Sequence, residues 1–248
     1  MIGHSVMQTK TQGIVLKSTK FSETSIVAHI YTLDYGMLGF MIHGARSSKA
    51  KISANLFQPL YLLDIVLYYH DPNKLQKIKE VRSNPALHHI PFDIGKTAIG
   101  FFMAEVLYKT LYEEGANYDL YNFLKQTIQK LDQEVTHYAN FPVFFLVLLS
   151  AYLGFFPRNN YAATHPHFNL EEGYFTDEPM VEEESIDQEC SSYLSQILEA
   201  DFENLENITI PEDKRLLLLN KFLDYYRFHM GGFSRLNAYQ VLREVLRS

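Results

Sequence analysis

The chain of 248 residues is 47% hydrophobic and 14% aromatic, a composition that excludes a disordered polypeptide and allows a sizeable core. Its single cysteine, Cys190, excludes a disulfide framework and a Cys-rich zinc site, and fits a reducing cytoplasm. The formal net charge of −7 argues against nucleic-acid binding over the whole surface.

The first six residues do not show the pattern of a signal peptide. They lack a cationic segment followed by an apolar one. We therefore expect Met7 to be the natural start and residues 1–6 to be an added extension.

Residues 10–82 have the short hydrophobic period of β-strands. Five segments rich in β-branched, aromatic or alternating apolar residues are expected to be strands: 11–17, 26–33, 38–43, 60–69 and 75–81. A long break at residues 44–55 separates the third from the fourth. Five strands in one short stretch predict a small closed barrel, either an OB-fold, which commonly binds single strands, or an SH3-like barrel.

From residue 85 onward the pattern is helical. Helices are expected at residues 96–112, 120–131, 185–199, 216–230 and 238–247, and Ser185 with Gln188 has the spacing of a capping box. Residues 141–156 are almost wholly apolar, but these 16 residues fall short of the roughly 20 that span a bilayer, so we predict a buried central helix and no membrane contact.

Residues 157–184 lack a helical period and are expected to form a long non-helical insert. The predicted class is α+β: a five-stranded OB-fold barrel at residues 7–83, followed by an all-α helical domain at residues 84–248 that carries this insert.

Charge is divided unevenly between these two parts. Residues 1–83 hold ten of the 22 Lys and Arg but five of the 29 Asp and Glu, a net charge of +5. Residues 84–248 hold the other 12 basic and 24 acidic side chains, a net charge of −12. Such a split predicts two units with different partners, of which the first can face phosphate.

The candidate DNA-binding residues are the basic side chains of the predicted barrel: Lys17, Lys20, Arg46, Lys49, Lys51, Lys74, Lys77 and Lys79. Residues 44–51 hold three of these cations among small residues and no carboxylate, so cations and backbone amides can both approach phosphate there. The alternative is a charged, solvated surface that only keeps the protein soluble.

Four aromatic residues of the predicted barrel could stack on bases: Phe21, Tyr31, Phe40 and Phe57. A small barrel needs large side chains inside, so we expect most of them in the core.

Three other motifs do not support catalysis or a cofactor. Gly95-Lys96-Thr97 lacks the glycine that a P-loop needs five positions earlier, where Ile90 stands, so a helix start is expected. His165 and His167 do not have a usual zinc-ligand spacing. Cys190 lies among acidic residues, which raise the pKa of a thiol. We expect no enzymatic activity, no metal and no cofactor.

An ordered set of short motifs resembles the RecO family of DNA repair proteins. The amino-terminal motifs are Gln-Gly-Ile-Val-Leu-Lys at 12–17, Glu-Thr-Ser at 23–25, Tyr-Gly at 35–36, His-Gly-Ala-Arg at 43–46 followed by Ser and Lys, and Gln-Pro-Leu at 58–60. Residues 223–232 and 241–245 resemble the carboxy-terminal helices of forms from the Bacteroidetes.

The resemblance implies an amino-terminal OB-fold and a helical domain in a cytoplasmic, nucleoid-associated bacterial protein. It also implies binding to single- and double-stranded DNA, annealing of complementary strands, work with RecR, and help in loading RecA onto strands covered by single-stranded-DNA-binding protein in the RecF pathway. Phosphate contact is carried over to Arg46 and Lys49, which match the family's Gly-Ala-Arg signature. The alternative function is a non-catalytic adaptor whose barrel binds a protein partner.

The sequence departs from the family pattern in one place. Many RecO proteins carry a four-cysteine zinc module after the apolar helix, whereas residues 157–179 hold no cysteine, so a zinc-free form is expected. The resemblance further implies a groove in the helical domain for the acidic, apolar tail of single-stranded-DNA-binding protein. Its candidate cations are Lys109, Lys125, Lys214, Arg215, Lys221 and Arg227.

Overall fold

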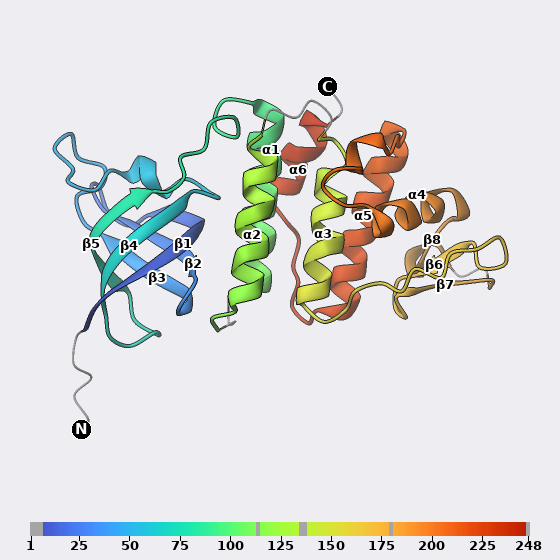
Figure 1. Ribbon diagram of the computed structural model, residues 1–248, viewed down its shortest axis with the longest axis horizontal. Coiled ribbons are helices and arrows are strands. Elements are labelled where there is room, and N and C mark those ends of the chain that lie inside the picture. The colour runs from blue at the N-terminus through green and yellow to red at the C-terminus, as the bar shows by residue number, and fades with distance from the viewer. Residues whose placement is uncertain (1–6, 113–114, 134–137, 179–180, 247–248) are drawn as a thin grey trace. The chain divides into compact units, whose positions relative to one another are not determined.

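The computed structural model describes residues 7–112, 115–133, 138–178 and 181–246, with the side chain of Glu182 excepted (Figure 1). The expected extension at residues 1–6 lies outside the described residues. Contacts divide the chain into two compact units, Met1–Gln133 and Glu134–Ser248. The first unit thus contains the barrel and two helices that follow the predicted barrel segment.

The prediction of a five-stranded OB-fold barrel is confirmed. Five strands close in the order β1-β2-β3-β5-β4, in which only β3 and β5 pair in parallel. Their bounds are β1 Met7–Lys20, β2 Ile26–Thr32, β3 Gly36–Ile42, β4 Leu62–Tyr69 and β5 Gln76–Ser83. β1 pairs with β4 through its first half and with β2 through its second, and a register shift between Val15 and Lys17 lets it serve both neighbours.

Alternate residues of each strand fill the barrel core, among them Ala28, Phe40 and Leu67, which are fully buried. Gln76 is also fully buried, and its Nε2 donates to the carbonyls of Asp71 and Lys74 at 2.7 Å each. This amide therefore holds the β4–β5 turn and positions Lys74. The connection from β3 to β4 contains the short 3-10 helix η1, Ala54–Phe57.

Two helices complete the first unit, α1 at Ile94–Thr110 and α2 at Tyr118–Leu131. The helix start expected at Gly95-Lys96-Thr97 is confirmed, because Asp93 caps α1 by accepting from the Lys96 N–H at 2.9 Å. The Lys96 side chain is buried and donates to the carbonyl of Gln133. α1 packs against β1.

The segment between β5 and α1 is held by one carboxylate. Asp132, directly after α2, accepts hydrogen bonds from the backbone N–H groups of His88, His89 and Ile90 at 2.7, 2.9 and 2.8 Å. A single side chain therefore fixes the backbone that leads from the barrel into α1.

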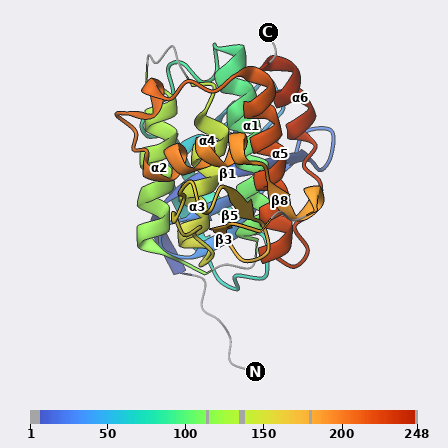
Figure 2. The same cartoon turned by 90° about the vertical axis from the view of Figure 1, so that its right-hand side faces the viewer.

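The described residues of the second unit contain four α-helices and a small sheet, and α3, α4 and α5 pack on one another (Figures 1 and 2). The helices are α3 Phe141–Tyr152, α4 Gln188–Glu199, α5 Glu212–His229 and α6 Ala238–Val245, and η3 spans Leu205–Asn207. The buried helix predicted at residues 141–156 is confirmed as α3, with Phe144, Phe145 and Leu146 fully buried, and ends earlier than expected. Within the described ranges, no helix combines the length and apolarity of a membrane span.

The capping box predicted at Ser185 and Gln188 is wrong. Ser185 lies in strand β8, Ser185–Ile186, and pairs with Asn169 of strand β6, His167–Asn169, so its backbone belongs to the sheet and cannot open the helix. Asp187 caps α4 instead, accepting from the Cys190 N–H at 2.8 Å.

The described residues of the predicted insert contain no α-helix, and they supply two strands of a three-stranded sheet in the order β7-β6-β8, namely β6 His167–Asn169 and β7 Tyr174–Thr176. The 3-10 helix η2 spans Glu182–Glu184, and the third strand, β8 Ser185–Ile186, lies just beyond the insert in residues that were expected to be helical. Buried Phe168 and Phe175 form the core of this sheet, with ring centroids 5.0 Å apart. The Asn160 carboxamide donates to the Phe175 carbonyl at 2.8 Å and accepts from its N–H at 2.9 Å, covering the β7 edge. Aromatic packing and asparagine hydrogen bonds organise a segment that has no cysteine.

Candidate nucleic-acid interface

One row of side chains crosses four strands on the outside of the barrel. The register places Val27 beside Met41, Met41 beside Lys77, and Lys77 beside Tyr68. The neighbouring row of Ala28, Phe40 and Gln76 is fully buried, so this row must point outward. Lys77 and Tyr68 are exposed, while Val27 and Met41 are half-buried. The row offers a cation and an aromatic ring on a shallow apolar surface.

The basic loop, which we define as residues 43–53, leaves β3 next to this row. Arg46, Lys49 and Lys51 are all exposed in it. Carboxylates are absent from its sequence. The three cations predicted for this loop are therefore at the surface, where they can reach phosphate.

Arg46 has a second role that its position in the sequence did not reveal. Its Nη1 donates to the carbonyl of Glu23 at 3.1 Å and to that of Ser22 at 3.5 Å, and its backbone N–H donates to the carbonyl of Thr24 at 3.0 Å. Arg46 thereby ties the basic loop to the β1–β2 loop, residues 21–25. Any phosphate contact by this guanidinium would be added to that structural role.

Lys17 and Lys20 lie on the second half of β1. The Lys17 Nζ is 4.4 Å from the centroid of the Tyr108 ring on α1, a cation–π contact. Lys20 is exposed at the end of the strand, next to the β1–β2 loop. Lys20 is thus close in sequence to the segment that Arg46 anchors, whereas Lys17 faces a helix.

The other candidate cations lie on β5 and the turn before it. Lys74 pairs with Asp71 at 3.7 Å, and the Lys79 Nζ donates to Gln8 Oε1 at 3.1 Å. In a strand with regular alternation, Lys77 and Lys79 would lie on the same face. The pairing shifts here, because Ile78 faces Leu67 while Glu80 faces the adjacent residue Val66, so strict alternation is interrupted at Lys79. Both lysines are nevertheless exposed.

The four aromatic candidates differ in their exposure to solvent. Phe40 and Phe57 are buried in the barrel core, as expected. Tyr31 is also fully buried but has the outward parity of Val27, so it lies outside the barrel core, where its hydroxyl donates to the Gly115 carbonyl at 3.3 Å. Phe21 is 66% exposed. Sequence reasoning missed Tyr68, which is 37% exposed. Because side chains alternate along a strand and Leu67 is apolar, the sequence could have indicated that Tyr68 points outward.

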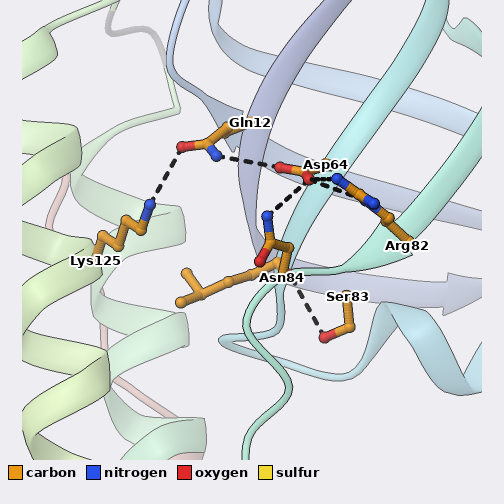
Figure 3. Close-up of polar contacts among 7 residues, drawn as sticks. Gln12, Asp64, Arg82, Ser83, Asn84 and Lys125 are labelled. Carbon is orange, nitrogen blue, oxygen red and sulfur yellow. Dashed lines mark hydrogen bonds and ion pairs between the residues drawn. The ribbon is translucent and has the colours of Figure 1, made fainter.

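Asp64, a carboxylate on β4, is enclosed by hydrogen bonds (Figure 3). Its Oδ2 accepts from Arg82 Nη2 at 2.9 Å and from Asn84 Nδ2 at 2.7 Å. Gln12 donates to Oδ1 at 3.1 Å and accepts from Lys125 Nζ at 3.3 Å. Burial raises the pKa of Asp64, but the hydrogen bonds from Asn84, Arg82 and Gln12 outweigh it and hold that pKa below its ordinary value. The network also binds Lys125 of α2 to the barrel.

The six helical cations expected to meet a partner do not form one cluster within either unit. In the first unit, Lys109 pairs with Glu105 at 3.7 Å, and Lys125 contacts Gln12. In the second unit, Lys214 pairs with Glu189, and Arg215 donates to the Ile210 carbonyl at 3.3 Å.

Lys221 and Arg227 of α5 do share a site. They line a pocket with Glu183, Asp224 and Phe228, whose ring is 47% exposed, and Arg227 pairs with Asp224. Lys221 and the accessible ring can meet a ligand that is both acidic and apolar, while Glu183 and Asp224 balance the charge of the two cations.

The lowered pKa of His29 predicts how the stability of the first unit depends on pH. Burial and the nearby Lys17 lower the pKa of His29, whose ring lies 5.2 Å from that of Tyr108. The unfolded chain therefore takes up the proton first, so stability is full above pH 6.5 and is lost as pH falls through the folded pKa. We expect the urea midpoint to fall between pH 7 and pH 5, and to fall less in His29→Phe. An equal fall in both proteins would contradict this assignment.

The described residues give no positive sign of catalysis. Cys190 is fully buried, and burial together with Asp187 raises the pKa of its thiol to about 12. Over the parts of the chain that the structure describes, no three His, Cys, Asp or Glu side chains gather into a metal-binding group.

Comparisons with known proteins agree over most of the chain. Residues 7–84 match the family described as Recombination protein O N terminal, and residues 91–237 match Recombination protein O C terminal. Proteins named DNA repair protein RecO are 30% identical in Flavobacterium psychrophilum and 32% identical in Bacteroides fragilis, each over 240 residues. Each alignment covers 96% of this chain and 99% of the relative.

Proposed function

Because the chain belongs to the RecO family of DNA repair proteins, we propose that its barrel binds single- and double-stranded DNA through the phosphate backbone and anneals complementary strands. The observation that supports this proposal most directly is that the basic loop has three exposed cations and no Asp or Glu in its sequence. Cations that contact only phosphate bind without reading sequence, so any two complementary strands can be held.

The outward row supports the same proposal. Lys77 and Tyr68 lie side by side beyond β3, the strand that leads into the basic loop. A groove lined by cations and an occasional ring is the usual way in which barrels bind single strands. Lys17, Lys20, Lys74 and Lys79 complete the proposed set of DNA-binding cations.

We further propose that the protein works with RecR to load RecA onto strands covered by single-stranded-DNA-binding protein, in the cytoplasm and at the nucleoid. The α5 pocket supports this proposal, because Lys221 and Arg227 can meet the carboxylates of an acidic tail while Phe228 meets its apolar side chains. No catalytic step is required of the protein in this role.

The test is the annealing rate of two complementary oligonucleotides, one of them labelled, with and without the full chain. We expect the protein to accelerate annealing at low salt and to lose this effect as salt rises. Annealing at the uncatalysed rate, together with salt-independent or undetectable binding of either strand, would instead favour the protein adaptor.

A further inference from the structure

Phe21 is an exposed aromatic residue in a segment that the barrel does not need for its core. It directly follows β1 and is 66% exposed, whereas Tyr31, Phe40 and Phe57 of the same barrel are at most 1% exposed. Leaving a large apolar ring in water forfeits the free energy of its burial. The ring of Phe21 is therefore accessible to a ligand that would cover it.

The exposure of Phe21 does not come from a loose loop. Its N–H donates to the Ser25 carbonyl at 3.0 Å, and the Ser25 N–H donates to Ser22 Oγ at 3.1 Å. Arg46 fastens the same loop from outside through the carbonyls of Ser22 and Glu23. The ring thus projects from a short, hydrogen-bonded turn, which lowers the entropy cost of binding a ligand to it.

The charges around Phe21 indicate an anionic ligand. Lys20 precedes it, and Arg46 brings the start of the basic loop to its turn. Glu23 is the single carboxylate in residues 20–25 and 43–53. A ligand that offers both a flat apolar face and negative charge at regular intervals is a single-stranded nucleic acid.

We propose that Phe21 stacks on an unpaired base of single-stranded DNA, whose adjoining phosphates contact Lys20 and the basic loop. This proposal rests on the DNA binding proposed above and adds to it a preference for unpaired strands. Bases inside a duplex are already stacked on both faces, so they offer no surface to the ring. Phe21 would then favour strands whose bases are unpaired, whereas the lysines would bind single- and double-stranded DNA alike.

The absence of tryptophan from the chain allows a direct test. Phe21→Trp introduces the one tryptophan of the full-length protein, so its fluorescence reports stacking at this position alone. We expect an oligothymidylate to quench it strongly and a duplex of the same length to quench it little. Phe92→Trp is the matched control, because Phe92 is 83% exposed but lies outside both loops, and its fluorescence should not respond.

Affinity supplies the second readout, measured by anisotropy of a labelled strand. Phe21→Ala should weaken single-strand binding about tenfold, duplex binding less than about twofold, and binding of an abasic strand not at all. The slope of affinity against salt should stay unchanged, because no phosphate contact is lost.

The outcomes separate this inference from the function on which it rests. If the wild-type protein binds no DNA, both fail. If it binds, but Phe21→Trp is not quenched or Phe21→Ala binds single strands as tightly as the wild type, the stacking role of Phe21 alone is overturned.

Discussion

Replacing Lys20, Lys49 and Lys51 together by alanine is expected to weaken single-strand binding by about 100-fold at 0.1 M salt. Each phosphate contact on a single strand contributes about 0.7 to the slope of log affinity against log salt, so three lost contacts lower the slope by about 2. The measurement is a salt titration of binding, followed by anisotropy of a labelled oligonucleotide. The three lysines are all exposed, so the variant should fold normally.

Arg46 is deliberately left in place in this variant. Its guanidinium holds the β1–β2 loop, so its removal would change loop conformation as well as charge. The matched control replaces Lys10, Lys130 and Arg158, which lie outside both loops, and lowers the net charge by the same amount. We expect that control to change affinity by less than about threefold. Equal losses in the two variants would show that net charge, and not the positions of Lys20, Lys49 and Lys51, governs binding.

Asp132→Ala is expected to destabilise the first unit by about 3 kcal/mol. The substitution removes the acceptor of three backbone N–H groups, those of His88, His89 and Ile90. Ile90 is buried, so its N–H would lose its partner without gaining water. The measurement is urea unfolding followed by circular dichroism.

Two further variants sharpen the Asp132 prediction. Asp132→Asn keeps Oδ1, which serves His89 and Ile90, but presents an NH2 group to the His88 N–H, so we expect a smaller loss. Asp119→Ala is the control, because Asp119 is an exposed carboxylate in the first turn of α2 and should cost less than about 1 kcal/mol. If Asp132→Ala costs no more than Asp119→Ala, the carboxylate does not hold the linker.

Most segments could be assigned to strand or helix from the sequence alone, with residues 185–186 as an exception. A period of two residues marked the five strands, and the apolar stretch marked α3, because side-chain burial on a regular backbone repeats with the geometry of that backbone. The uneven distribution of charge predicted two parts with different partners. The ordered motifs indicated the family, which the comparisons then established. These features are local or compositional, so one chain read in order is enough to find them.

The roles of individual side chains depend on contacts that form only in the folded chain. Phe21 and Phe40 are the same residue type in the same barrel, yet the ring of one is exposed and that of the other fills the core. Arg46 and Asp132 act on carbonyls and N–H groups 22 to 44 residues away in the chain. Asp187 rather than Ser185 caps α4, because Ser185 pairs with Asn169 of the insert in a β-sheet. Contacts between residues distant in sequence leave no period or motif, because they depend on how separate elements come together when the chain folds.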